Sequence, residues 1–223
     1  MKSGPVIWVE GIIGSGKSTL AEALSKALHL RMFHEPVNSN PYLERFYVDQ
    51  KRYALEMQMF LLKRRHVIQK LATLEAEYGE EYHGSVLDRG LPGDRVFAKL
   101  HHRIGNIEDL GWRAYEEAFN YACMDLRPPS LFLFLDVEPS VALERIRKRQ
   151  RPAEAGIDLS YMVDLQRGYL DLLCEIESKT HAWSKGMEIL RLPWNVDHQS
   201  SKELVSLLRD KFHIPVTQPV CAP

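Results

Sequence analysis

Short apolar runs alternate along the chain with longer stretches in which apolar positions recur every three or four residues. The short runs predict β-strands and the longer stretches predict amphipathic α-helices. The expected strands are Pro5–Glu10, Arg31–His34, Ser85–Asp88, Leu131–Val137 and Glu188–Leu192. The expected helices cover 17–29, 51–77, 106–124, 139–150, 158–180 and 200–212. This alternation predicts an α/β fold.

The strand pattern also predicts how the sheet is built. Residues 131–135 are apolar without alternation, which is typical of a strand buried on both faces. Strands that are separated by helices pair in parallel, with helices on both faces of the sheet. We therefore expect a five-stranded parallel sheet flanked by helices. We expect a single domain over residues 1–212, followed by a proline-bearing tail at 213–223.

Composition narrows the class of protein. The chain has 223 residues, 45% hydrophobic and 26% charged, as in ordinary globular proteins. Its net charge of −1 creates no overall field that attracts nucleic acid or an anionic membrane. No apolar run reaches the ~20 residues of a membrane span, and the first residues lack signal-peptide features. Cys123, Cys174 and Cys221 are too few and too far apart for a disulfide framework or metal cluster. We expect a cytoplasmic protein with small-molecule ligands and neither nucleic-acid nor membrane partners.

The most specific chemical signal follows the first expected strand. Residues 11–18, GIIGSGKS, fit the pattern GxxxxGK[ST] and precede a helix. Glycines let the backbone direct N–H groups at phosphate oxygens, and the helix N-terminus adds partial positive charge. Lys17 is expected to reach the β- and γ-phosphates of ATP, and the Ser18 hydroxyl to bind Mg²⁺. The expected ATP-binding residues of this loop are Gly11, Ile12, Ile13, Gly14, Ser15, Gly16, Lys17, Ser18 and Thr19. The loop predicts a P-loop kinase fold and leaves the phosphoryl acceptor open.

Acidic and basic residues end the next two expected strands. Glu35 follows the second strand, and Asp88 and Arg89 end the third. The carboxyl ends of parallel strands form the edge at which such folds bind ligands. Glu35 can accept the proton of a hydroxyl group, Asp88 can hold Mg²⁺, and Arg89 can bridge Glu35 and the transferring phosphoryl group. Each of these residues also has a simpler interpretation. Glu35 alone fits a solvated acid in a turn, and Asp88 with Arg89 fits an ion pair that stabilises a turn.

The long helix at 51–77 carries two polar residues on one face. Gln58 and Arg65 are seven residues apart, nearly two turns, whereas Arg64 is rotated away. The Gln58 amide offers one acceptor and two donors, which suits a nucleobase edge. Arg65 can orient a carboxylate or contact the base. A solvated helix face is the alternative interpretation.

A basic run covers residues 145–151. Arg145 and Arg149 are one helical turn apart, and Arg151 follows just before Pro152 and Gly156. This arrangement suits a short arginine-rich lid, at about 145–157, that closes over phosphates. A solvated helix face and a nucleic-acid-binding patch are the alternatives.

Taken in order, these motifs resemble the deoxynucleoside kinases, the group of deoxycytidine, deoxyguanosine and deoxyadenosine kinases. The resemblance runs from about residue 5 to 210, and residues 40–65 are most similar to the bacterial deoxyadenosine/deoxyguanosine kinases. It implies ATP-dependent phosphorylation of the 5′-hydroxyl of deoxynucleosides in nucleotide salvage. Purine deoxynucleosides are the expected substrates, with deoxycytidine in addition. The resemblance also implies Mg²⁺ and a homodimer.

The resemblance assigns roles to individual residues. It implies that Glu35 is the general base and that Arg89 lies beside it. Tyr47 and Glu154 are expected to bind the 3′-hydroxyl, Tyr47 also crowding the 2′ position. Gln58 is expected to read the base.

Further roles concern the base pocket and ATP. Arg65 and Asp94 fall on a pair that shapes the base pocket and is missing from thymidine-accepting members. The lid arginines, Arg145, Arg149 and Arg151, are expected to join Lys17 in stabilising the transition state, with Arg149 and Arg151 as catalytic residues. The segment PWNVDHQ at 193–199 is expected to border the adenine of ATP. The expected ATP-binding residues in these two segments are Arg145, Arg149 and Asp197.

The chain departs from the family pattern at three places, which involve four residues. Gly90 stands where serine is usual, Ile12 stands where asparagine is usual, and Pro92 with Gly93 replaces a bulkier segment. The last of these bears on the shape of the base pocket near Asp94.

Two other functions are considered. A nucleoside monophosphate kinase, such as a thymidylate kinase, shares the loop and lid, but it needs additional basic residues for the acceptor phosphate, which Glu35 would repel. A nucleotide-dependent nucleic-acid-binding regulatory module would use the 145–151 run and show a steep dependence on salt. The near-neutral net charge disfavours it.

Overall fold

A five-stranded parallel sheet forms the centre of the molecule. The computed structural model describes residues 3–36, 40–151, 154–195 and 201–215. The strand order is β2-β3-β1-β4-β5. The strands are β1 (Val6–Glu10), β2 (Arg31–Phe33), β3 (Ser85–Asp88), β4 (Leu131–Asp136) and β5 (Ile189–Pro193). The helices are α1 (Lys17–Leu28), α2 (Leu43–Val48), α3 (Gln50–Tyr78), α4 (Leu91–Arg103), α5 (Asp109–Met124), α6 (Pro139–Arg149), α7 (Leu159–Glu177) and α8 (Ser201–Phe212).

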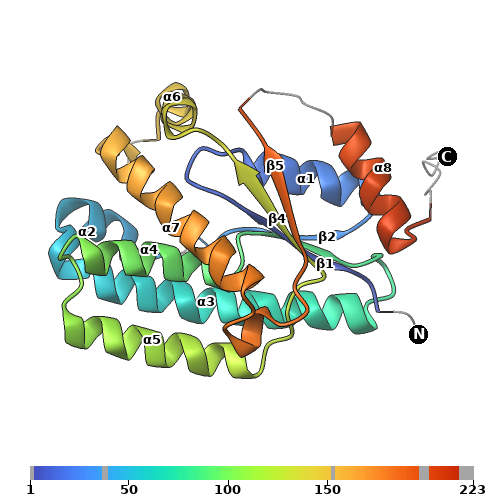
Figure 1. Ribbon diagram of the computed structural model, residues 1–223, viewed down its shortest axis with the longest axis horizontal. Helices are drawn as coiled ribbons and strands as arrows, with labels where there is room; N and C mark the ends of the chain where they lie inside the picture. The colour runs from blue at the N-terminus through green and yellow to red at the C-terminus, as the bar shows by residue number, and fades with distance from the viewer. Residues whose placement is uncertain (1–2, 37–39, 152–153, 196–200, 216–223) are drawn as a thin grey trace.

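Helices cover both faces of this sheet (Figure 1). Helices α1 and α8 pack together on one face, and α3, α4 and α7 lie on the other. Helix α5 packs against α3 and α4 and forms an outer layer. The parallel α/β fold expected from the alternating pattern is confirmed. Within the described part of the chain, no helix is long and apolar enough to span a membrane.

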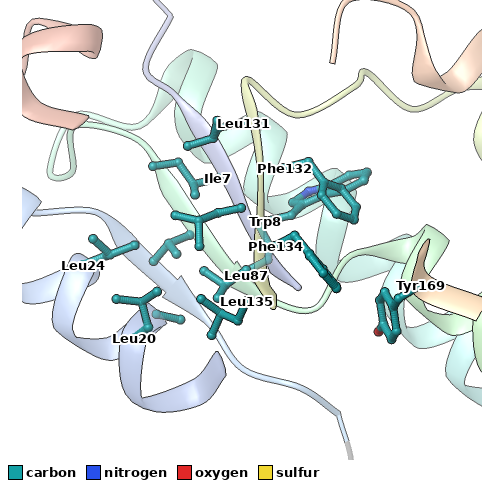
Figure 2. Packing of buried hydrophobic residues seen from close by; sticks show 14 of the residues in the cluster. Ile7, Trp8, Leu20, Leu24, Leu87, Leu131, Phe132, Phe134, Leu135 and Tyr169 are labelled. Carbon is teal, nitrogen blue, oxygen red and sulfur yellow. The ribbon is translucent and has the colours of Figure 1, made fainter. Parts of the chain in front are cut away.

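The buried strand β4 shows why the sheet needs cover on both faces. Its aliphatic side chains at 131 and 135 point towards Leu20 and Leu24 of α1, as Figure 2 shows. The aromatic Phe132 and Phe134 point to the opposite face, where Phe134 lies 5.7 Å, ring centroid to centroid, from Tyr169 of α7. Successive side chains of a strand alternate between faces, so an uninterrupted apolar run fills both core layers.

Two helices were not predicted from the sequence. Helix α2 has six residues, too few to show a helical period. Helix α4 begins at Leu91 and contains Pro92 and Gly93 in its first turn, and these two residues are more typical of turns than of helices. Proline is compatible with the first turn of a helix, because its missing N–H would have no partner there.

The structure explains two departures from the family pattern. A Cβ atom on Gly90 would lie 2.5 Å from Cδ2 of Trp8, a buried residue of β1. A Cβ atom on Gly93 would lie 2.5 Å from a carboxylate oxygen of Glu10. Trp8 and Glu10 thus occupy the space that larger residues at 90 and 93 would need.

This packing predicts the effect of restoring serine at position 90. Gly90→Ser should lower the free energy of unfolding by about 1–3 kcal/mol, because overpacking forces the Trp8 ring to move. In a Trp8→Val background, the same change should cost less, since the space is open. Urea denaturation of the four proteins measures both costs. An equal cost in both backgrounds would show that Trp8 is not what requires the glycine.

Candidate active site

The loop between β1 and α1 has the backbone shape of a phosphate-binding loop. Gly14 and Gly16 have φ angles of 76° and 95°, the left-handed region that favours glycine. Lys17 is buried and its Nζ donates to the carbonyl oxygen of Ile12 at 2.9 Å. Burial, and then the nearby Arg89, lowers the pKa of Lys17 to about 8. The lysine therefore stays mostly charged at neutral pH, next to the positive end of α1.

Ser18 and Asp88 come together beside this loop. The Ser18 hydroxyl donates to Oδ2 of Asp88 at 2.5 Å. The other carboxylate oxygen of Asp88 is buried and has no hydrogen-bond partner among the described residues. Mg²⁺ prefers oxygen ligands, and one or two protein oxygens suffice when phosphates and water supply the others. These two residues fit a magnesium ion.

Glu35 lies between two buried arginines. Its Oε1 accepts hydrogen bonds from Nη2 of Arg65 at 2.5 Å and from Nε of Arg89 at 3.1 Å. Burial raises the pKa of the Glu35 carboxyl, but Arg65, Arg89 and Lys17 outweigh burial and lower that pKa to about 2. Glu35 is therefore ionised throughout the neutral pH range.

Further carboxylates balance the two arginines. Nε of Arg65 lies 2.6 Å from Oδ1 of Asp94, and both side chains are almost fully buried. Burial lowers the pKa of Arg65, but Asp94 and Glu35 outweigh this effect and keep it charged. Arg89 lies 3.7 Å from a carboxylate oxygen of Glu10. The result is a chain of ion pairs that begins at Asp94 and ends at Glu10, with Glu35 at its centre between the two arginines.

One cavity, of about 150 Å³, connects these groups to a site that can hold a base. Gln58 of α3 is only 1% exposed and lines this cavity, as does Asp94 of α4. Oε1 of Gln58 and Oδ2 of Asp94 have no hydrogen-bond partner in the described part of the protein. Both atoms are hydrogen-bond acceptors, and a buried acceptor without a donor is energetically costly. A ligand that donates hydrogen bonds to them would remove this cost. Phe97 and Met57 supply apolar walls.

Tyr47 and Glu154 line the same cavity near Glu35. Burial raises the pKa of Tyr47 to about 12, with further contributions from Glu154 and Glu35, so the hydroxyl remains a donor. Nη2 of Arg149 donates to both carboxylate oxygens of Glu154 at 2.7 Å. Arg151 lies 3.7 Å from the same carboxylate. One carboxylate and two guanidinium groups from the segment expected to form the lid thus line the cavity.

The family model described as deoxynucleoside kinase matches residues 7–210 of the chain. The chain belongs to the deoxynucleoside kinase family. It is a kinase that uses ATP to phosphorylate deoxynucleosides, as the resemblance implied, and neither alternative function is favoured.

Named relatives support this assignment. The chain is 34% identical to deoxyadenosine kinase of Dictyostelium discoideum, over 94% of this chain and 80% of that protein. It is 32% identical to deoxyadenosine/deoxycytidine kinase of Bacillus subtilis (strain 168), over 74% of each. The solved structure of deoxyadenosine kinase from M. mycoides with bound dCTP superposes with a TM-score of 0.75 at 25% identity, covering 93% of this chain and 98% of that one. This structural similarity agrees with a P-loop kinase fold.

Most residues expected at the kinase site line this one cavity. They are Ile13, Gly14, Lys17, Ser18, Glu35, Tyr47, Gln58, Arg65, Arg89, Asp94, Arg149, Arg151 and Glu154. Arg145 does not line it. Its guanidinium donates to the carbonyl oxygens of Ser15, Trp194 and Asn195 at 3.1–3.4 Å, which joins the phosphate loop to the segment after β5. Asp197 lies outside the described residues.

The structure decides between the alternatives left open by the sequence. Gln58 and Arg65 are not on a solvated face, since they are 1% and 3% exposed, whereas Arg64 is exposed. Asp88 and Arg89 do not pair with one another as a turn-stabilising ion pair would. Their side chains contact Ser18 and Glu35 instead.

Sequence reasoning missed three residues next to this site. Phe97 was missed because α4 was not predicted. Glu10 gave a weak signal, since it is an acid that ends an apolar strand one residue before the phosphate loop. Tyr169 gave none, because tyrosine on a helix facing the core is ordinary. The Arg89 guanidinium lies 4.7 Å from the centroid of the Phe97 ring, and it also donates to the Tyr169 hydroxyl.

The position of Glu35 predicts the effect of removing its charge. Glu35→Gln should lower kcat by about 10²–10⁴-fold, the range of general-base catalysis, and should leave the KM for ATP nearly unchanged. A coupled ADP-release assay measures both constants. Glu188→Gln removes an exposed glutamate that pairs with Lys211 and is the matched control. A near-normal kcat for Glu35→Gln would contradict the assignment of Glu35.

Proposed function

We propose that this kinase transfers the γ-phosphoryl group of ATP to the 5′-hydroxyl of purine deoxynucleosides, deoxyadenosine and deoxyguanosine, and also accepts deoxycytidine. One observation carries the proposal. The ionised Glu35 lines the same cavity as Lys17 and Ser18 of the phosphate loop and as Gln58 of α3. A nucleoside whose base lies at Gln58 would direct its sugar towards Glu35 and its 5′-oxygen towards the phosphate loop.

Each charged residue has a defined task in this proposal. Glu35 accepts the proton of the 5′-hydroxyl as that oxygen attacks the γ-phosphorus of ATP. Lys17, Arg89 and the lid arginines at 149 and 151 stabilise the charge on the transferring phosphoryl oxygens. Ser18 and Asp88 would hold Mg²⁺, which supplies further neutralisation of the phosphates when it is bound.

The base preference rests on the two buried acceptors. Oε1 of Gln58 and Oδ2 of Asp94 can each accept from a ring N–H or an exocyclic amine. Adenine, guanine and cytosine carry such an amine, whereas thymine has a methyl group that would meet the charged pair of Arg65 and Asp94. Two named relatives, a deoxyguanosine kinase of Dictyostelium discoideum and a deoxyadenosine/deoxycytidine kinase of Bacillus subtilis, act on bases of this group.

The remaining expectations concern organisation. We propose a single kinase domain over residues 1–212, with a lid at about 145–157, that acts as a homodimer in the cytoplasm. The free thiols of Cys123 and Cys174 agree with a reducing compartment. An apolar stripe on α3, whose members are about half exposed or more, is a suitable dimer contact. The stripe consists of Val67, Leu71, Leu74 and Tyr78.

A panel of acceptors tests the reaction and the sugar preference together. The kcat/KM for deoxyadenosine should exceed that for adenosine by about 10- to 100-fold, and 3′-deoxy analogues should lose as much, because Tyr47 and Glu154 would be left without partners. dAMP should not be an acceptor. The ADP-release assay measures each substrate, with Tyr47→Phe expected to weaken discrimination at the 3′ position. Equal efficiency for adenosine and deoxyadenosine, or activity with dAMP, would contradict the proposal.

A double substitution tests the role of Arg65 and Asp94 in choosing the base. Arg65→Met with Asp94→Ala should raise the ratio of kcat/KM for thymidine to that for deoxyadenosine. Both activities should fall, since Arg65 also holds Glu35, so the ratio is the readout. Arg95→Met is the matched control, because Arg95 pairs with Glu116 away from the cavity. A preference of the unmodified kinase for thymidine would contradict this account.

A further inference from the structure

Glu10 is a fully buried carboxylate without a role in the mechanism above. It ends β1, and it does not line the cavity that holds Glu35 and the phosphate loop. A buried carboxylate is costly unless hydrogen bonds or opposite charges satisfy it. The groups that its two carboxylate oxygens contact therefore indicate its role.

One oxygen of Glu10 holds the backbone that follows Arg89. Oε1 accepts a hydrogen bond from the Gly90 N–H at 2.6 Å. Arg89 has a φ of 71°, a left-handed conformation that is costly for any residue other than glycine. The bond fixes the next peptide group in the orientation that this conformation requires. Backbone strain of this kind persists where the surroundings enforce it.

The other oxygen faces the far end of Arg89. Oε2 of Glu10 accepts from the Tyr169 hydroxyl at 3.1 Å and lies 3.7 Å from Nη1 of Arg89. Nη1 itself donates to the Tyr169 hydroxyl. On its remaining edge, Arg89 donates through Nε to Glu35. The hydroxyl thus links the two charged groups, and Arg89 is held from opposite sides by Glu10 and Glu35.

The first turn of α4 leaves room for this carboxylate. A Cβ atom on Gly93 would lie 2.5 Å and 2.7 Å from the two carboxylate oxygens of Glu10 and 2.9 Å from Cγ of Arg89. Gly93, which departs from the family pattern, therefore leaves the space that the Glu10 carboxylate occupies. Burial raises the pKa of Glu10, and the positive charges of Arg89, Arg65 and Lys17 lower it. Burial outweighs these charges, and the resulting pKa is about 7.

We propose that Glu10 is a positioning residue for phosphoryl transfer, whose single carboxylate fixes both the backbone and the guanidinium of Arg89 beside Glu35. The inference rests on the proposed roles of Glu35 and Arg89. Positioning by a remote group changes kcat more than substrate affinity, because small displacements at the reacting centre are costly.

The test is a double-mutant cycle on kcat, measured at pH 8, where a Glu10 with a pKa of about 7 is mostly ionised. Glu10→Gln keeps an acceptor for Gly90 and removes the charge that faces Arg89. It should lower kcat by about tenfold or more, the scale of one charge-assisted hydrogen bond, and leave the KM values for ATP and deoxyadenosine unchanged. In an Arg89→Ala background, the same substitution should have no further effect, because residues that act through one another are not additive.

Tyr169→Phe removes a single oxygen atom and keeps the proposal testable if Glu10→Gln folds poorly. It should lower kcat in the same direction by a smaller factor, with the KM values unchanged. Glu116→Gln, which breaks a pair with Arg95 outside this network, should leave kcat unchanged. Thermal melts show whether each variant is folded.

Two kinds of result would overturn the inference. In the first, Glu10→Gln and Tyr169→Phe each leave kcat intact. In the second, Glu10→Gln lowers kcat by the same factor with arginine and with alanine at position 89. Either result would make Glu10 a purely structural residue. Failure of the proposed role of Arg89 is distinguishable from both results, because Arg89→Ala alone would then retain full activity. Failure of the proposed function would appear as a lack of activity with deoxyadenosine in the unmodified protein.

Discussion

The site depends on one constraint, which is that a partly buried carboxylate must stay ionised. Glu35 meets it by lying between the guanidinium groups of Arg65 and Arg89. Two buried guanidiniums would themselves be costly, and each therefore has a second carboxylate, Asp94 for Arg65 and Glu10 for Arg89. Removing any member leaves another buried charge without its partner, so the network acts as a unit.

The fold brings this network together from distant segments. Parallel strands end at one edge of the sheet, so β1, β3 and the segment after β2 deliver Glu10, Arg89 and Glu35 to the phosphate loop. Helix α3 runs past that edge and supplies Arg65, while the first turn of α4 supplies Asp94. Arg65 contacts both Glu35, the proposed proton acceptor, and Asp94, the acid proposed to shape the base pocket. In this proposal, base selection and catalysis share one ion-pair network.

Local patterns were sufficient to predict much of this structure. Apolar runs indicated the strands, the glycine-rich motif indicated the phosphate loop, and a seven-residue spacing placed Gln58 and Arg65 on one face. Helix α4 was missed because Pro92 and Gly93 look like a turn, although both fit a helix start. The partnership of Glu10 with Gly90 and Gly93 depends on residues about 80 positions apart that meet only through tertiary packing. No local pattern encodes it, and the two unusual glycines are explained only by what fills the space beside them.

The most direct test of the central constraint is an NMR titration of the Glu35 side-chain carboxyl in the unliganded kinase, assigned by comparison with Glu35→Gln. The account predicts a pKa of about 2, so that Glu35 remains ionised at pH 4, where an ordinary glutamate with a pKa of 4.5 is largely protonated. In Arg65→Met, the pKa should rise towards the ordinary value, because one of the two adjacent positive charges is gone. A Glu35 that titrates near 4.5 in the unmodified protein would contradict the account.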